Sequence, residues 1–539
     1  MDIETDIVIV GAGSAGCALA GRLARGTALR VLLVEAGGRA RSPWLHIPAG
    51  YYRTAYDERY SWRLQTEPQQ ALGGRRLEWP RGRVLGGSSA INGLVYVRGQ
   101  PEDYDGWAAA GCTGWGWSDV LPVFRRSERN WRGAGPCHGG DGPLGVSPIP
   151  MRHRLLDRFI AAAEARGIPR NDDFNGPVQE GAGYFDLTTA GGLRCSAARA
   201  YLGRPLPRNL RIMTGWTAES VEIAEGRARG LRLHRAGGGA ARVRAAAAVV
   251  LCAGAIGSPA LLWQSGIGPG HDLAAAGLDV RHDLPEVGRN LQDHFQVKIA
   301  ARVDGTDSYN LIWHSPLRRL GAALEFALHR RGPLAASGGQ VGLFARVGPG
   351  ATRPDVQFHV SPQSTADPAR GLDRFAGFTV GVCVLRPESR GTLRPARLPG
   401  PGAPRLQTLI DPACLSDPGD TALTVAGLRL ALDILRTPPF AAHLRGLAGG
   451  LGPEASDEAL AAHCAATGNT VYHPAGTCRM GGDAASVVDP GLRLRGVAGL
   501  YVADASVMPT LISGNTNAPC IMIGERAADL LRADLGAGT

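Results

Sequence analysis

The chain opens on Ile3-Glu-Thr-Asp-Ile-Val-Ile-Val-Gly-Ala-Gly-Ser-Ala-Gly16, and this stretch predicts the fold. The β-branched run that ends at Val10 is typical of a buried parallel strand. Residues 17–24 are rich in alanine and leucine, and a second apolar run over residues 30–34 ends in Glu35. A strand, a glycine turn, a helix and another strand in this order predict a doubly wound α/β domain.

The three glycines of the turn have the spacing that a dinucleotide requires. Gly11 permits a tight turn, Gly13 lets the backbone approach a pyrophosphate, and Gly16 lets the helix pack on the strand. Glu35 follows about 20 residues later, where a carboxylate accepts hydrogen bonds from ribose hydroxyls. An acid here disfavours a ribose 2′-phosphate, but the unit alone does not separate FAD from NAD. The residues expected to contact the dinucleotide are Gly11, Gly13, Ser14, Ala15, Gly16, Glu35 and Ala36.

Size and charge limit the class of protein. A chain of 539 residues exceeds one ordinary core, so we expect two domains. The formal net charge is +10, and nearly all the positive charge is arginine because Lys298 is the only lysine. The arginines are spread along the chain without a basic stripe, so we expect no nucleic-acid partner. Peripheral association with anionic lipid head groups stays open.

The cysteines and the apolar runs point to a cytoplasmic protein. The 10 cysteines are far apart and include no Cys-x-x-Cys pair, which argues against a zinc ribbon or a disulfide scaffold. We therefore expect no metal site. The acidic amino terminus lacks the features of a signal peptide, and the longest apolar run is too short to span a bilayer.

The pattern along the chain predicts two domains, one of them discontinuous. Residues 1–295 are expected to form the dinucleotide-binding domain, with residues 43–145 as extended loops that wrap the cofactor. Alternating stretches at 355–360 and 378–385 favour an antiparallel sheet with one covered face, which makes residues 296–460 the expected substrate-binding domain. Residues 461–539 are expected to return to the first domain.

Four further segments resemble the glucose–methanol–choline (GMC) oxidoreductases, in the branch of choline and alcohol dehydrogenases. Pro80-Arg-Gly-Arg-Val-Leu-Gly-Gly-Ser-Ser-Ala-Ile-Asn-Gly93 and Gly254-Ala-Ile-Gly-Ser-Pro-Ala-Leu-Leu-Trp-Gln-Ser-Gly-Ile-Gly268 are similar to the two family signatures. Val471-Tyr-His-Pro-Ala-Gly-Thr-Cys-Arg-Met-Gly481 and the segment 502–519 look like the catalytic and carboxyl-terminal flavin segments. The resemblance implies FAD rather than NAD, held by a Rossmann-like domain beside an antiparallel substrate domain.

The resemblance also implies which residues hold the flavin. Some relatives attach it covalently through a histidine in the first signature, but here that region is Ser89-Ala90-Ile91, so we expect non-covalent FAD. The small residues around Gly86 suit close approach of a phosphate. The further residues expected to line the cofactor are Val84, Ser88, Asn92, Gly93, Leu94, Val95, Ala218, Asp504, Ala505, Asn515 and Thr516.

His473 and Asn517 are the expected catalytic pair. Oxidation of an alcohol requires the hydroxyl proton to leave as hydride moves from carbon to flavin N5, and a histidine is a natural base. By resemblance, the second catalytic position holds histidine or asparagine, which suggests that Asn517 stabilises the substrate oxygen. Asn517 is also placed to cap the last helix. His294 matches a family segment but is expected to be structural.

The substrate and the electron acceptor stay partly open. A quaternary ammonium requires a carboxylate or an aromatic cage. Choline oxidases carry a glutamate where this chain has Gln340-Val-Gly-Leu-Phe344, which favours a neutral primary alcohol or a polyol. Choline and sorbose-type sugars are the alternatives. The acceptor is a quinone-type carrier or O2, and we favour a dehydrogenase.

Two other classes remain as alternatives. An NAD-linked dehydrogenase leaves the segments 86–93 and 473–481 without a role. A non-catalytic flavin-binding protein is disfavoured by the presence of both His473 and Asn517, because these residues would be lost first.

Overall fold

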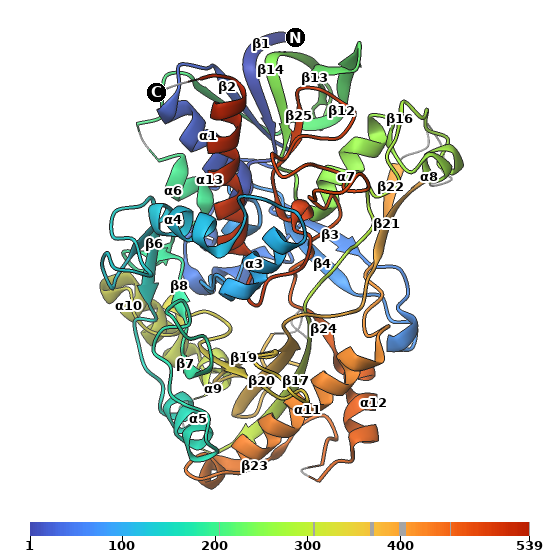
Figure 1. Cartoon of the computed structure of the whole chain (residues 1–539). Helices are drawn as coiled ribbons and strands as arrows, with labels where there is room; N and C mark the ends of the chain where they lie inside the picture. The colour runs from blue at the N-terminus through green and yellow to red at the C-terminus, as the bar shows by residue number, and fades with distance from the viewer. Residues whose placement is uncertain (204, 305–307, 367–370, 398–405, 453, 538–539) are drawn as a thin grey trace.

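The computed structural model describes the chain except residues 204, 305–307, 367–370, 398–405, 453 and 538–539. A seven-stranded sheet forms the upper half of the molecule (Figure 1). Its parallel strands are β1 (Asp2–Val10), β2 (Val31–Glu35), β11 (Leu210–Thr214), β14 (Ala240–Leu251) and β25 (Leu500–Val502). Strands β12 (Thr217–Ala224) and β13 (Arg227–His234) continue from β14 in antiparallel pairing. The predicted doubly wound sheet is confirmed.

The two ends of the chain meet on this sheet. Helix α1 (Ser14–Gly26) packs against the last helix, α13 (Asn517–Asp534). The approach is close because both helices present small residues: a Cβ added to Gly524 would lie 2.3 Å from the carbonyl oxygen of Ala15. This contact brings the carboxyl-terminal segment to the glycine turn.

A second seven-stranded sheet, entirely antiparallel, forms the lower half (Figure 1). Valine and phenylalanine side chains of one face pack against α11 (Pro418–Leu435), whose Gly427 lies directly over Val382. The other face carries polar residues. The strands, in spatial order, are β23 (Leu444–Leu447), β17 (Phe295–Val303), β20 (Gly377–Val384), β19 (Val356–Ser361), β18 (Val341–Ala345) and β7 (Gly181–Tyr184), with β24 (Asn469–Thr470) paired to β17.

The sheets do not follow the predicted division of the chain. Strand β7 and the neighbouring helix α5 (Arg154–Ala165) come from the range assigned to the first domain, yet β7 pairs with β18. Strand β24 lies beyond residue 460 and pairs with β17. Edge strands are contributed from distant segments because pairing depends on contacts that alternation along one strand does not reveal.

Residues 43–145 are more regular than the extended loops predicted for them. They contain the hairpin β3 (Ser61–Gln65) and β4 (Glu78–Gly82), and helices α3 (Pro101–Ala109) and α4 (Trp117–Ser127). Frequent Trp, Arg and Gly obscured the helical period here.

The other α-helices and β-strands of the chain are α2 (Tyr51–Thr54), β5 (Glu128–Asn130), β6 (Leu144–Pro148), β8 (Asp186–Leu187), β9 (Thr189–Ala190), β10 (Leu193–Arg194), α6 (Ala197–Tyr201), α7 (Gly254–Gln264), β15 (Ile267–Gly268), α8 (Gly270–Ala275), β16 (His282–Asp283), α9 (Tyr309–Trp313), α10 (Pro316–His329), β21 (Thr392–Arg397), β22 (Leu406–Asp411) and α12 (Asp457–Thr467).

All ten cysteines are free thiols, most of them buried. In the part of the chain that the structure describes, no helix combines the length and the apolar character needed to cross a bilayer.

Candidate active site

The glycine turn lies at the carboxyl end of β1, where backbone atoms pack closely against one another and leave no room for a Cβ at Gly11 or Gly16. Gly11 has φ +98°, and a Cβ there would lie 2.4 Å from the carbonyl oxygen of Cys252. A Cβ on Gly16 would lie 1.9 Å from the carbonyl oxygen of Gly11, whereas a Cβ on Gly13 would meet open space. No side chain caps the amino terminus of α1, so its N–H groups are available to an anion.

The first signature folds over this turn. The amide of Gly86 donates to the carbonyl of Ala12 at 2.8 Å, and a Cβ on Gly87 would lie 2.6 Å from the Cα of Gly13. The side chains of Ser88 and Asn92 hold the loop itself together, since they accept hydrogen bonds from Gly82 N and from Arg194. Val84, Leu94 and Val95 are buried, and Leu94 has φ +70°.

Two predicted acidic residues flank the turn. The Glu35 carboxylate accepts from the amides of Ala12 at 2.9 Å and Gly37 at 2.8 Å, and burial raises its pKa to about 7. Trp216, two residues before the predicted residue Ala218, donates its amide to the Glu35 carbonyl. Asp504 is buried and accepts from Ser258 Oγ at 2.6 Å and from the Gly254 amide. Asp504 thereby ties α7 to the carboxyl-terminal segment.

The loop that carries His473 is attached on both sides. The amide of His473 donates to Asp293 Oδ1 at 2.7 Å, and the amide of Gly476 donates to the carbonyl of Ala505 at 3.1 Å. Gly476 has φ +91° and leaves no room for a Cβ, which would lie 2.4 Å from the Asn290 carbonyl oxygen. These contacts hold the loop between the segment 290–294 and the residues after β25.

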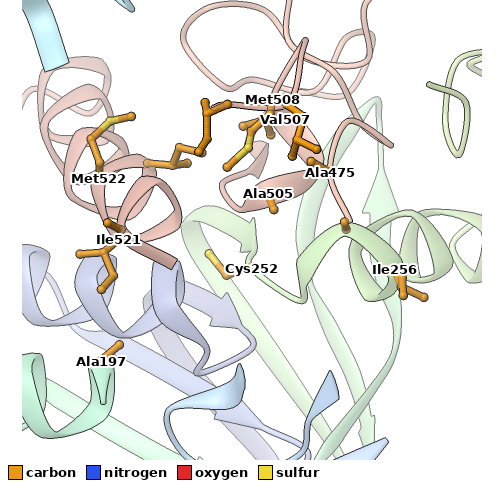
Figure 2. Close-up of a cluster of buried hydrophobic side chains, with 14 of the residues drawn as sticks. Ala197, Cys252, Ile256, Ala475, Ala505, Val507, Met508, Ile521 and Met522 are labelled. Atoms are coloured by element: carbon orange, nitrogen blue, oxygen red, sulfur yellow. The ribbon is translucent and has the colours of Figure 1, made fainter. Parts of the chain in front are cut away.

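Apolar side chains form the base of this loop. Figure 2 shows Ala475, Ala505, Val507 and Met508 beside Cys252, with Ile521 and Met522 approaching from α13. Because all these side chains are buried, the loop rests on close-packed core and not on solvent.

A chain of hydrogen bonds fixes the tautomer of His473. The Leu385 carbonyl only accepts, so His294 donates from Nε2 at 2.9 Å and its Nδ1 is left as an acceptor. His473 Nδ1 lies 2.9 Å from that atom and therefore carries the hydrogen. His473 Nε2 is then an unprotonated acceptor, and it lies 3.3 Å from Asn515 Nδ2. His294 thereby orients the His473 imidazole.

Asn515, and not Asn517, is the carboxamide beside His473. Gln357 Nε2 donates to Asn515 Oδ1 at 3.1 Å, which directs the amide nitrogen of Asn515 toward the imidazole. Asn517 is the first residue of α13, and its Oδ1 accepts from Ser14 Oγ of the glycine turn at 2.8 Å. The predicted pairing of His473 with Asn517 is wrong. Asn515 lies just before α13 and Asn517 is the first residue of that helix, so the two side chains point to different partners.

The imidazoles in this cluster are neutral at pH 7. Burial lowers the pKa of His473 well below its ordinary value, and the neighbouring His294 and His359 lower it further. Burial also lowers the pKa of His294 to about 4. The pKa of His359 falls to about 4 through burial, against the opposing effect of a hydrogen bond with Asn515. A neutral imidazole with an unprotonated Nε2 is the form that accepts a proton.

Lys298 lies on the same face of the second sheet as this cluster. Register places Lys298, Gly381 and His359 in one row across three strands, and Gln296 beside them bonds His359 Nδ1 at 2.9 Å. The Lys298 side chain is exposed, yet the surrounding protein lowers its pKa. Among the described residues, no carboxylate forms an ion pair with it. The polar face of the second sheet therefore carries a lysine beside the histidine cluster without a described ion-pair partner.

Comparison with known proteins identifies the family of the chain. Sequence models of the family described as GMC oxidoreductase match residues 5–296 and 387–524. The chain is 39% identical over 535 residues to an alcohol dehydrogenase [acceptor] of Pseudomonas putida, covering 98% of this chain and 95% of that protein. It is 40% identical over 546 residues to the mitochondrial choline dehydrogenase of Homo sapiens, covering 98% and 90%.

The chain belongs to the GMC oxidoreductase family. Pyridoxine 4-oxidase from Mesorbium loti has a similar structure, with a TM-score of 0.85 and 32% identity over 97% of this chain and 98% of the other. Membership confirms the predicted family, its FAD cofactor and the oxidation of alcohol (CH–OH) groups as the general chemistry.

The residues of this GMC oxidoreductase fit FAD. The open side of Gly13, the uncapped start of α1 and the Gly86–Gly87 loop form a cradle that accommodates phosphates, and Glu35 lies at its edge. Arg81 is partly buried beside the loop that carries His473, and its buried Nε and Nη2 have no hydrogen-bond partner among the described residues. These open donors and the cradle suit a large, anionic and polar ligand.

Sequence reasoning missed the partners of His473. Asn515 was assigned to the flavin, and Gln357 and His359 were not singled out. Alternation along β19 places Gln357 and His359 on one face, which was the available signal. Lys298 was considered only in the net charge of the chain. The presence of a single lysine, within a half-buried strand, was a second feature that could have identified this face of the sheet.

Proposed function

We propose that this chain is an FAD-dependent alcohol dehydrogenase that holds FAD non-covalently and oxidises a neutral primary alcohol or a polyol. The observation that carries the proposal is the unprotonated Nε2 of His473 beside the amide of Asn515. FAD, when bound, accepts the two electrons and the hydrogen lost from the alcohol carbon. The residues that would hold it are those of the glycine turn, the loop 84–95 and the segment 504–516.

Within the proposal, His473 takes the hydroxyl proton of the substrate. Its Nδ1–H stays bonded to His294, so the new positive charge is shared with a second imidazole. Asn515 donates from Nδ2 to the alcohol oxygen as negative charge develops there, because Gln357 holds its oxygen on the other side. The product is an aldehyde for a primary alcohol.

The charge of the site supports a neutral substrate over choline. Lys298 is a cation on the substrate face. Gln340, which stands where choline oxidases carry glutamate, accepts a hydrogen bond from the Tyr309 hydroxyl. A quaternary ammonium would meet no described carboxylate in the row of Lys298 and His359. Sequence identity does not separate the two substrates, because the alcohol dehydrogenase and the choline dehydrogenase are 39% and 40% identical to this chain.

Anaerobic reduction of the holoenzyme tests class and substrate together. We expect the absorbance of bound FAD near 450 nm to bleach with primary alcohols or polyols and slowly with choline.

His473→Ala should keep FAD and lower the reduction rate constant about 1000-fold. Asn515→Ala should lower it about 100-fold, while Asn517→Ala, at equal FAD content, should lower it much less. A larger defect in Asn517→Ala would contradict the assignment, and bleaching by choline alone would overturn the substrate class.

The electron acceptor is proposed to be a quinone-type carrier. One similar protein is named for an unspecified acceptor, while others are named oxygen-dependent choline dehydrogenases. Turnover should increase strongly when a soluble quinone is added to air-saturated buffer. Equal turnover in air without quinone would identify an oxidase.

A further inference from the structure

Helix α10 turns its apolar side toward solvent. Leu317, Leu320, Leu324 and Leu328 follow the three- and four-residue spacing that places side chains on one face of a helix. Their exposed fractions are 82%, 57%, 52% and 72%. A surface helix of a globular protein ordinarily turns such a face toward the core. We call these four residues the leucine stripe.

The helix is fastened to the protein by its opposite side. Phe326 is the one buried side chain among the residues of α10, and it lies two positions from both Leu324 and Leu328, about half a turn away. The helix contacts α9 and the short turn 333–335, and the Arg330 guanidinium lies 5.2 Å from the Phe326 ring. Figure 1 shows α10 at the periphery of the molecule. The leucine stripe is therefore held outward by the way the helix is attached.

Basic residues accompany the leucine stripe. Residues 313–331 contain four arginines and a single acidic residue, Glu325. Arg319, Arg330 and Arg331 are exposed, as is Trp313 just before the helix. Leucines on one face, exposed arginines near both ends of the helix and a neighbouring tryptophan are typical of a helix that lies in the plane of a membrane surface.

We propose that α10 docks this protein on an anionic lipid surface, with the leucine stripe among the acyl chains and the arginines at the head groups. The 14-residue helix is about 21 Å long and basic, so it lies on a bilayer and does not span one. A second copy of the chain fits less well, because symmetric pairing of two stripes would bring the same arginines together. This proposal does not depend on the proposed function.

Sedimentation of the full-length holoenzyme with vesicles tests the docking. The vesicles are phosphatidylcholine, alone or with about 30% phosphatidylglycerol. We expect binding to the anionic vesicles that weakens at high salt. Leu320→Ser with Leu324→Ser should lower the partition coefficient about 100-fold, and Arg319→Gln with Arg331→Gln about tenfold. The matched control, Val178→Ser with Val280→Ser, removes two exposed apolar residues elsewhere and should leave binding unchanged.

The outcomes separate the possible occupants. Oxidation of a water-soluble alcohol with a soluble acceptor should be equal in every variant, because α10 contributes nothing to the catalytic cluster. Absence of binding by the unmodified protein, or equal binding by the leucine variant, would overturn the proposal. So would an oligomer that the leucine substitutions convert to monomer, since a second copy would then occupy the stripe.

Discussion

The two sheets contribute to the site in different ways. The first presents backbone, because a Cβ on Gly11 or Gly87 would collide with neighbouring backbone, while Gly13 leaves open space beside them. The second presents polar side chains, Gln357, His359 and Lys298, that alternate with core residues along their strands. Close backbone approach demands glycine at fixed spacing and therefore leaves a recognisable pattern. Polar positions on a half-buried sheet accept many residue types, so they can differ between relatives that share a fold.

This comparison implies that the cofactor side tolerates the least change. Gly87→Ala should abolish retention of FAD, with affinity reduced at least about 100-fold, because the new methyl meets the Gly13 backbone at 2.6 Å and φ is +53°. The measurement is the ratio of absorbance at 450 nm to that at 280 nm after desalting.

Gly73→Ala is the matched control for this change. Gly73 has φ +64°, similar to Gly87, but a Cβ there meets nothing within 4 Å. Both variants strain the backbone alike, and only one closes the cradle. Equal FAD loss in the two would show that backbone strain, and not contact with the turn, is responsible.

On the substrate side, a large effect is also expected at His294, a residue that would not contact the alcohol. His294→Leu removes the acceptor of the His473 Nδ1–H and should lower kcat/KM roughly tenfold to a hundredfold, with FAD retained. His294→Gln restores an acceptor oxygen and should recover part of the loss. If the two variants were equally impaired, packing and not the tautomer would explain the role of His294.

The pH profile distinguishes this buried imidazole from an exposed one. Protonation of His473 removes the base, so activity falls as pH drops through its pKa. Burial lowers that pKa well below 6.5, so kcat/KM should be nearly flat from pH 8 to pH 6. A base with the ordinary pKa of about 6.5 would lose about fourfold by pH 6. The reductive half-reaction measured across this range decides, and an acid limb centred above pH 6.5 would contradict the assignment.

The same contrast explains what could be predicted from sequence. The stretch 3–35 predicted the parallel sheet, because each residue in it serves a local requirement of strand, turn or helix. The pairing of His473 with Asn515 could not be derived in the same way, since Asn515 and Asn517 are two residues apart and only the start of α13 sends them in different directions. The pairing of β7 with β18 could not be predicted for a similar reason, because the pairing of an edge strand depends on tertiary contacts with a distant segment.

Lys298 offers the smallest expected effect and the sharpest test of how the second sheet selects its substrate. A charge acting over roughly 10 Å of partly solvated protein is worth about 1 kcal/mol, or about fivefold. Lys298→Met should therefore raise kcat/KM for choline about fivefold relative to a neutral alcohol, while kcat for the neutral alcohol changes little. Arg302→Met is the control, because Arg302 lies two rows further along the same face of β17 and its guanidinium stacks on Phe375. If both variants changed the ratio equally, general surface charge would be responsible; if only Lys298→Met did, the row shared with His359 would be the part of the sheet that senses substrate charge.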